Sequence, residues 1–271
     1  MAKPYVRGRS MDLLYVFLRY FFETEYLHFG YWDEGVALKF ANLKQAQRRY
    51  VDEVFKLIPD DVESILDVGC GSGAMAVELL EAGYRVDCVC PPSLLSAEAK
   101  EKLAAKATVF EQRFEELETD RRYDLILFSE SFQFVELYSS FNQCKRYGRQ
   151  YVLIADIFRR DMPERGPIGG GHKYAEFKKV FALTKIDELD ITRFVAPGID
   201  LEVDAMRNFL QPFLKVVDRI ATQKNRFVYR IFRILNRRGI ARARKRYLDN
   251  DRRSAAAFEK YKNYKIVLFK L

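Results

Sequence analysis

The 271-residue chain is poor in the residues that build metal sites and disulfide frameworks. It holds two histidines and four cysteines, and a chain of this length with so few cysteines does not indicate a disulfide framework. Cys88 and Cys90 have no ligand-forming residues at metal-site spacing, so we interpret them as two small residues of a buried strand and predict no metal site. Unpaired thiols favour a reducing, cytoplasmic location.

The chain also lacks a long uncharged run. No segment approaches the roughly 18 uncharged residues that a membrane-spanning helix requires. The apolar stretch 13–18 lies between Asp12 and Arg19 and has no small-residue cleavage site, so we expect no signal peptide. Because 49% of the residues are hydrophobic, the chain can bury one sizeable core.

The chain has no excess of positive charge outside one segment. The net charge is +8, yet twelve lysines and arginines fall between Thr222 and Arg253, which leaves 34 of the 46 basic residues against 36 of the 38 acidic ones elsewhere. Around 226–237, apolar and basic residues alternate with the spacing of an amphipathic helix. This helix either presents a solvated outer face or is attracted to an anionic membrane surface or an acidic substrate. No nucleic-acid-binding motif is present, so we expect no nucleic acid partner.

Strand and helix signals alternate along most of the chain. The expected strands are 64–68, 85–89, 108–111, 123–128, 151–157, 184–191 and 264–271. The expected helices are 11–24, 37–57, 74–82, 94–105, 134–147, 174–183 and most of 201–262, with interruptions near Pro212, Gly239 and Asn250. The segment 158–172 is rich in glycine and proline and is expected to be a loop. Such alternation predicts an α/β fold whose parallel sheet is covered on both faces.

The most informative segment is the turn between the first strand and the helix that follows it. It reads Asp67, Val68, Gly69, Cys70, Gly71, Ser72, Gly73. Glycines at alternate positions let the backbone turn sharply and approach a ligand closely, because they carry no Cβ. Asp67 would repel a pyrophosphate, whereas it suits a ligand with a cationic amino group. The segment therefore predicts a small-molecule site at this end of the strand.

This segment resembles the first motif, D-x-G-x-G-x-G, of the class I S-adenosylmethionine (SAM) methyltransferases. The resemblance implies a Rossmann-like, seven-stranded, mostly parallel sheet with an antiparallel last strand, helices on both faces and a helical lid. It divides the chain into an N-terminal helical cap (1–58), a SAM-binding α/β core (59–200), a basic helical lid (201–262) and a terminal strand of the core (263–271).

The resemblance also assigns cofactor-binding roles. Asp67 would orient the amino group of the methionine moiety, and the residues of the turn would let the backbone pass close to the cofactor; these are Gly69, Cys70, Gly71 and Gly73. Cys90 stands where family members carry an acid for the ribose hydroxyls, and Arg113 stands where many carry an acid for adenine. Backbone groups at Phe114 would read the adenine ring, and Ser129 would lie beside the reactive methyl group.

A second resemblance lies in the aromatic N-terminal region. The residues Tyr26 to Trp32 are similar to the segment "HFGYW" of small-molecule methyltransferases such as those acting on tocopherols and sterols. It implies that Tyr31 and Trp32 close the cofactor pocket and that His28 contacts substrate. The alternative is that these residues fasten an N-terminal helix to the domain and that His28 is a packed or capping residue.

Two further groups of residues are candidates for contact with the methyl acceptor. Glu130 and Gln133 follow the fourth strand, and we assign Glu130 a catalytic role and Gln133 a substrate-binding role; the alternative is a polar helix start. Gly170 and Gly171 would fold over the substrate, with His172 as general base. Here the alternative is a flexible loop with an exposed histidine.

These observations predict a methyltransferase that transfers the methyl group of SAM to a small, hydrophobic or amphipathic metabolite, with specialised-metabolite biosynthesis as the expected setting. Two alternatives stay open. One is a lipid-modifying methyltransferase that is peripheral to an anionic membrane, docked through the basic segment. The other is a catalytically silent partner of an active enzyme, suggested by Cys90 and Arg113. The residues do not indicate an oligomeric state.

Overall fold

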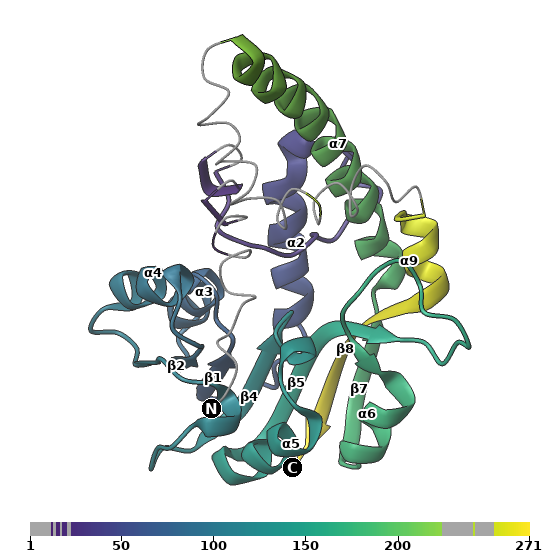
Figure 1. Cartoon of the computed structure of the whole chain (residues 1–271). Coiled ribbons are helices and arrows are strands. Elements are labelled where there is room, and N and C mark those ends of the chain that lie inside the picture. The colour runs from purple at the N-terminus through teal and green to yellow at the C-terminus, as the bar shows by residue number, and fades with distance from the viewer. Residues whose placement is uncertain (1–11, 13–14, 17, 21–22, 224–240, 242–251) are drawn as a thin grey trace.

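The fold is built around one sheet, shown in the computed structural model of Figure 1. The structure describes residues 12, 15–16, 18–20, 23–223, 241 and 252–271. The strands run in the order β3-β2-β1-β4-β5-β8-β7, and β6 pairs with β5 outside this path. The strand bounds are β1 Ser64–Val68, β2 Arg85–Val89, β3 Val109–Phe110, β4 Tyr123–Ser129, β5 Gly148–Arg159, β6 His172–Lys173, β7 Thr184–Asp190 and β8 Lys262–Lys270.

All neighbouring strands are parallel except β8, which runs antiparallel to both β5 and β7. This arrangement confirms the predicted Rossmann-like, mostly parallel sheet with an antiparallel last strand. The two-residue strand β6 lies at the end of the segment 158–172, which was expected to be a loop throughout. It forms because His172 comes alongside Phe158 at the end of β5.

Helices cover both faces of the sheet, because successive strand residues point to opposite sides. One face, with Ile65 of β1, packs against α2, α3, α4, α7 and α9, and the other, with Leu66, packs against α5 and α6. The helix bounds are α2 Leu43–Phe55, α3 Ala74–Glu81, α4 Leu94–Leu103, α5 Leu137–Tyr147, α6 Tyr174–Val180, α7 Thr192–Gln223 and α9 Ala255–Tyr261. Short 3-10 turns are η1 Phe40–Asn42, η2 Phe114–Glu116 and η3 Phe132–Phe134.

The first predicted helix, 11–24, ends earlier than expected. Residues 12, 15–16 and 18–20 are helical, whereas residues 23–39 contain no helix or strand. Glu23 adopts a positive φ of 50°, which ends a right-handed helix. The segment then crosses α2, where Gly30 has a φ of 80° and a Cβ on it would lie 2.8 Å from the Cβ of Ala46. Gly30 therefore allows the extended segment to lie close against α2.

The C-terminal helical region also differs from the prediction. Helix α7 begins at Thr192 and continues through Pro212, so the expected interruption there is wrong and the predicted core–lid boundary at 200/201 falls inside one helix. A proline removes one backbone hydrogen bond, and that loss alone need not end a long helix. Most of the basic segment, including the expected interruptions at Gly239 and Asn250, lies outside the described residues. Of the helices in the described ranges, none combines the length and apolar character of a membrane span.

Candidate functional site

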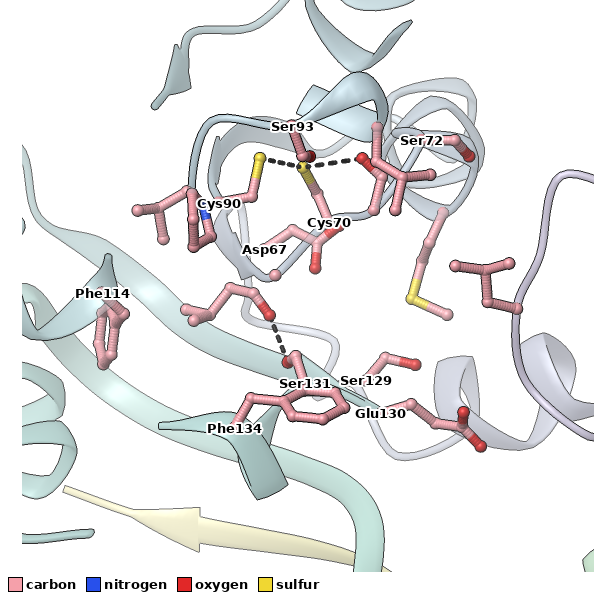
Figure 2. Close-up of a pocket in the computed structure, with 18 of the residues that line it drawn as sticks. Asp67, Cys70, Ser72, Cys90, Ser93, Phe114, Ser129, Glu130, Ser131 and Phe134 are labelled. Atoms are coloured by element: carbon pink, nitrogen blue, oxygen red, sulfur yellow. Dashed lines mark hydrogen bonds between the residues drawn. The ribbon is translucent and has the colours of Figure 1, made fainter. Parts of the chain in front are cut away.

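A cavity lies where β1, β2 and β4 end. The sheet order reverses between β1 and β4, and in open α/β sheets ligands bind at such a point, beyond the carboxyl ends of the strands. Figure 2 shows Asp67 and Cys70 of the first turn on one side of this cavity and Ser129 and Glu130 on the other. Of the predicted site residues, the cavity wall includes His28, Asp67, Gly69, Cys70, Gly71, Cys90, Phe114, Ser129 and Glu130.

The three glycines of the turn have different structural roles. A Cβ on Gly69 would lie 2.4 Å from the Cβ of Ser131, whose hydroxyl donates a hydrogen bond to the carbonyl of Val68. Gly73 caps α3 with a φ of 78° and packs against α4, so it does not line the cavity. Gly71 has a φ of 58°, and a Cβ there would meet no atom within 4 Å. Gly71 is thus the glycine that leaves space for a ligand.

Asp67 is buried at the end of β1, with 2% of its surface exposed. Its Oδ2 atom has no hydrogen-bond partner among the described residues, and burial raises the pKa of the carboxyl group to about 7. An unpaired buried carboxylate is costly, and a cationic group in the cavity would remove that cost. Asp67 is therefore suited to hold an ammonium group.

Cys90 does not offer the chemistry of the acid that the family resemblance leads us to expect at this position. Its Sγ lies 3.5 Å from the Sγ of Cys70, which donates a weak hydrogen bond to it. This contact and burial raise the pKa of the Cys90 thiol far above its ordinary value. A neutral thiol is a weak hydrogen-bond partner and cannot accept two hydroxyl protons as a carboxylate does. Phe114, which also lines the cavity, is buried against Phe128 at a distance of 5.4 Å between the ring centres.

Glu130 lies in a strained position on the opposite wall. Its φ is 54°, in the left-handed region that side chains other than glycine rarely adopt. Its carboxylate accepts a hydrogen bond of 2.9 Å from the Tyr264 hydroxyl. Burial, the most important cause, and the nearby charge of Asp156 together raise the pKa of Glu130 to about 8. A carboxylate with a pKa near neutrality can exchange protons with a substrate.

Gln133, a predicted substrate residue, is directed away from the cavity. Its backbone N–H and its side-chain amide donate hydrogen bonds of 2.9 and 3.2 Å to the two carboxylate oxygens of Asp156 on β5. Gln133 is not part of the cavity wall. Gln133 is held in this position because the carboxylate of Asp156, buried on β5, needs hydrogen-bond donors.

His28 lines the cavity as a neutral group. Burial lowers its pKa to about 3, and neither ring nitrogen has a partner among the described residues. Its ring packs on that of Tyr50 at a distance of 4.2 Å, and the amide of Gln47 donates a hydrogen bond of 2.8 Å to its carbonyl oxygen. Helix α2 thus holds His28 at the cavity wall.

Tyr31 and Trp32 were expected to close the cofactor pocket. Neither residue is part of the cavity wall. The ring of Tyr31 stacks on Phe194 at 4.4 Å. Trp32 is 5% exposed and donates a hydrogen bond of 2.7 Å from its ring nitrogen to the carbonyl of Phe29. The backbone N–H of Trp32 donates a hydrogen bond of 2.8 Å to the carbonyl of Phe194. Both residues therefore fasten the N-terminal segment to α7. The alternative interpretation had assumed a helix here, which residues 23–39 do not contain.

The glycine-rich loop also lies elsewhere than expected, because it folds back on β5. A Cβ on Gly171 would lie 2.6 Å from the carbonyl oxygen of Ile157, and one on Gly170 would lie 2.3 Å from the side-chain oxygen of Gln133. A ring nitrogen of His172 is hydrogen-bonded to the carbonyl of Phe132 at 3.0 Å. None of the three loop residues is part of the cavity wall, so the geometry offers Glu130, not His172, as the base.

The sequence analysis missed three residues that contact Glu130 or the wall beside it. They are Tyr50 on α2, Asp156 on β5 and Tyr264 on β8. For Asp156 a signal existed, since it is the one acid in the apolar run 151–158. For Tyr50 and Tyr264 the sequence offered no signal other than a hydroxyl group among apolar neighbours. In the described part of the chain, no cluster of histidine, cysteine and acidic side chains is placed to hold a metal ion.

Comparison with known proteins also indicates a methyltransferase. Residues 42–141 match the family model described as a methyltransferase domain. A relative from Oryza sativa subsp. japonica, described as a probable chloroplastic tocopherol O-methyltransferase, is 40% identical over 55 residues, 18% of this chain and 15% of the relative. The ubiquinone biosynthesis O-methyltransferase of Rickettsia bellii is 30% identical over 121 residues, 41% of this chain and 49% of the relative. The matched regions thus span less than half of either relative.

Structural similarity to known proteins extends over more of the chain than sequence similarity does. Geranyl diphosphate C-methyltransferase from Streptomyces coelicolor A3(2), solved with Mg2+, geranyl-S-thiolodiphosphate and S-adenosyl-L-homocysteine, superimposes with a TM-score of 0.68. The superposition covers 99% of this chain and 98% of the other at 13% sequence identity. At this identity the likeness establishes the fold alone.

Proposed function

We propose that this chain, a member of the class I SAM-dependent methyltransferase family, binds SAM and transfers its methyl group to a small molecule. The observation that carries the proposal is the unpaired Oδ2 atom of Asp67 at the cavity wall. A buried carboxylate without a partner requires a donor from outside the protein, and the amino group of the methionine moiety is such a donor.

The other residues of the turn fit the same cofactor. Gly71 leaves the space beside Asp67 open, and Phe114 contributes an aromatic wall further along the cavity. When bound, SAM supplies a methyl group whose bond to sulfur breaks, with the electron pair passing to sulfur, as the bond to the acceptor forms. The chain's own task is then to hold the acceptor in line and to exclude water.

The acceptor in this proposal is small and largely apolar. Leu27, Phe134 and Val135 contribute apolar side chains to the cavity wall, and largely apolar walls with a few polar groups are typical of small-molecule sites. The names of the relatives, a tocopherol and a ubiquinone-biosynthesis O-methyltransferase, are consistent with an acceptor of this kind. We keep specialised-metabolite biosynthesis as the proposed setting. Residues 224–240 and 242–251 of the predicted lid lie outside the described residues.

Calorimetric titration of the folded protein with SAM and with S-adenosylhomocysteine tests the proposal. Micromolar affinity for either compound is the expected result. Adenosine triphosphate serves as a control, because Asp67 would repel its phosphates, and we expect it to bind at least tenfold more weakly.

One observation favours a second candidate function. Cys90 is engaged with Cys70 and lacks the carboxylate that would hold the ribose. If the folded protein binds neither SAM nor S-adenosylhomocysteine, the proposed activity is wrong, and a catalytically silent partner of an active enzyme becomes the better proposal.

A further inference from the structure

The side chains around Glu130 form a hydrogen-bonded chain that begins and ends at the cavity wall. The hydroxyls of Ser129 and Tyr50 are 3.1 Å apart, those of Tyr50 and Tyr264 are 2.9 Å apart, and Tyr264 donates to Glu130. When Glu130 is ionised, the single Tyr264 proton is used on the carboxylate. The Tyr264 oxygen then accepts from Tyr50 and does not donate to it, and the Tyr50 oxygen can accept from Ser129. In this state all donors of the chain point toward Glu130.

This directed chain stabilises the ionised form of Glu130, although no cation does so. Among the described residues, no lysine, arginine or histidine forms an ion pair with Glu130. The groups that face it are Tyr264 of β8, Tyr50 of α2 and Asp156 of β5. A carboxylate held in this way keeps one oxygen free for a proton donor in the cavity.

The charge of the wall limits which acceptor can bind there. The acids of the wall are Asp67, Glu25, Glu115 and Glu130. Glu115 forms an ion pair of 3.0 Å with Arg113, the cationic side chain of the wall, and Glu25 forms one of 2.5 Å with Lys102. Among the described residues, Asp67 and Glu130 are therefore the wall acids without an ion pair. His28 is neutral. An acceptor with a phosphate or carboxylate group would therefore meet like charges, whereas an uncharged acceptor would not.

We infer that the acceptor is an uncharged molecule with a phenolic hydroxyl group, that Glu130 receives the proton of this hydroxyl, and that Tyr264 positions Glu130 for the transfer. The inference rests on the proposed function and names the substrate class of that site. The phenol's O–H bond breaks and its proton moves to the Glu130 carboxylate. The phenol oxygen forms the new bond to the methyl carbon, and sulfur keeps the electron pair of the bond that breaks. Protonated Glu130 then releases its proton to solvent.

The acidities of the two groups suit this step. Burial raises the pKa of Glu130 to about 8, and a phenol such as the tyrosine side chain has a pKa of about 10. A small difference in pKa between the proton donor and the acceptor favours the transfer once Glu130 is ionised, which its pKa places at a pH of about 8 and above. Tyr264 is a positioning residue, because it acts through Glu130.

A pair of matched probes tests the inference without a known substrate. We would titrate the protein with 4-methylphenol and with toluene, which lacks the hydroxyl, and also with geranyl diphosphate as an anionic competitor. Each titration is run from pH 6 to 10, with and without saturating S-adenosylhomocysteine. We expect 4-methylphenol to bind at least about tenfold more tightly than the other two, as for a hydrogen bond to a charged group.

Three variants assign the roles. E130Q is expected to remove the advantage of 4-methylphenol over toluene. In wild type, affinity for 4-methylphenol should rise with pH around 8 as Glu130 ionises and should fall again near pH 10, where the phenol itself loses its proton. Tyr264→Phe should move this rise to higher pH, because the carboxylate loses its donor. Tyr151→Phe, which removes a tyrosine hydroxyl bonded to Asp61 far from the cavity, should leave the profile in place.

Equal binding of toluene, tighter binding of geranyl diphosphate, or an unchanged preference in folded E130Q would overturn the inferred substrate class. Superimposed pH profiles of Tyr264→Phe and wild type would overturn the positioning role. If Tyr264→Phe does not fold, Tyr50→Phe replaces it, with a smaller shift expected and the same overturning outcome. If the protein does not bind S-adenosylhomocysteine, the proposed function is contradicted. The inferred substrate class is still tested in that case, because the titration with 4-methylphenol is also run without S-adenosylhomocysteine.

Discussion

The hydroxyl of Tyr264 donates a hydrogen bond of 2.9 Å to the carboxylate of Glu130. This contact joins the last strand of the chain to the residue that follows β4. Glu130 has a φ of 54°, a conformation that costs a side chain other than glycine about 1–3 kcal/mol. Tyr264 and the backbone bond of 2.8 Å from Glu130 to Ala155 hold it there. Strain of this kind concentrates at functional sites.

Asp67→Asn should weaken the binding of S-adenosylhomocysteine by about tenfold or more. The variant loses the charge that would hold the amino group, and a hydrogen bond to a charged group contributes about 1.5–3 kcal/mol. Methylthioadenosine has no amino-acid moiety, so its affinity should change by less than about twofold. Calorimetry with both ligands checks this. Equal losses for the two would mean that Asp67 does not contact the amino group.

The same substitution should change how stability depends on pH. The pKa of Asp67 is about 7 in the folded protein and about 3.9 in an unfolded chain. The folded state therefore binds more protons between these values, and its stability falls as pH rises from about 4 to about 7. The full difference corresponds to about 4 kcal/mol.

Asp67→Asn lacks this titration, so its free energy of unfolding relative to wild type should be higher at pH 8 than at pH 4. Urea unfolding of both proteins without ligand, at the two pH values, measures the difference. Other buried acids titrate in both proteins and cancel in the comparison. A difference that is the same at both pH values would show that Asp67 is already ionised at pH 4.

Gly71→Asn should weaken cofactor binding by at least about tenfold while the protein stays folded. The added side chain would project into space that contains no protein atom within 4 Å, and asparagine tolerates the left-handed conformation. Gly83→Asn is the matched control. Gly83 also has a positive φ, 97°, and open space around it, but it lies in the turn after α3, outside the cavity wall. A similar loss of affinity in both variants would trace the effect to backbone strain.

Cys90→Asp should strengthen the binding of S-adenosylhomocysteine by about tenfold, because a carboxylate can accept both ribose hydroxyls. The ligand-free variant should be less stable than wild type, since the new acid is buried near Asp67. Cys144→Ser, at a buried thiol on the other face of the sheet, is a control for loss of a buried thiol. An unchanged affinity would mean that the chain holds the ribose by other groups.

Local patterns predicted the part of the fold that positions the cofactor site. The bounds of β1 and β2 were predicted to the residue, because an apolar run next to turn residues identifies a buried strand. Asp67 and Gly71 were singled out because a turn of this kind needs particular residues at fixed spacing, and both lie at the cavity wall. These features depend only on neighbours in the sequence.

The acceptor side of the cavity depends on contacts that the sequence does not encode locally. Tyr50 and Tyr264 are 214 positions apart, and only the folded sheet brings their hydroxyls together. Glycines at 169–171 predict a sharp turn but not its direction, so His172 was expected near the substrate. Pairing with the end of β5 turns it toward Phe132 instead.

Gly198→Ala should destabilise the protein even though alanine favours helix over glycine by about 1 kcal/mol. Gly198 lies inside α7, where a Cβ would be 2.5 Å from the carbonyl oxygen of Phe29 and 3.0 Å from the ring nitrogen of Trp32. Overpacking of this kind costs about 1–3 kcal/mol, so we expect a net loss of about 1 kcal/mol in urea unfolding. The methyl group would push the N-terminal segment, and His28 with it, away from α7, so affinity for 4-methylphenol should fall as well. A variant as stable as wild type would show that this segment is not fastened to α7 through Trp32.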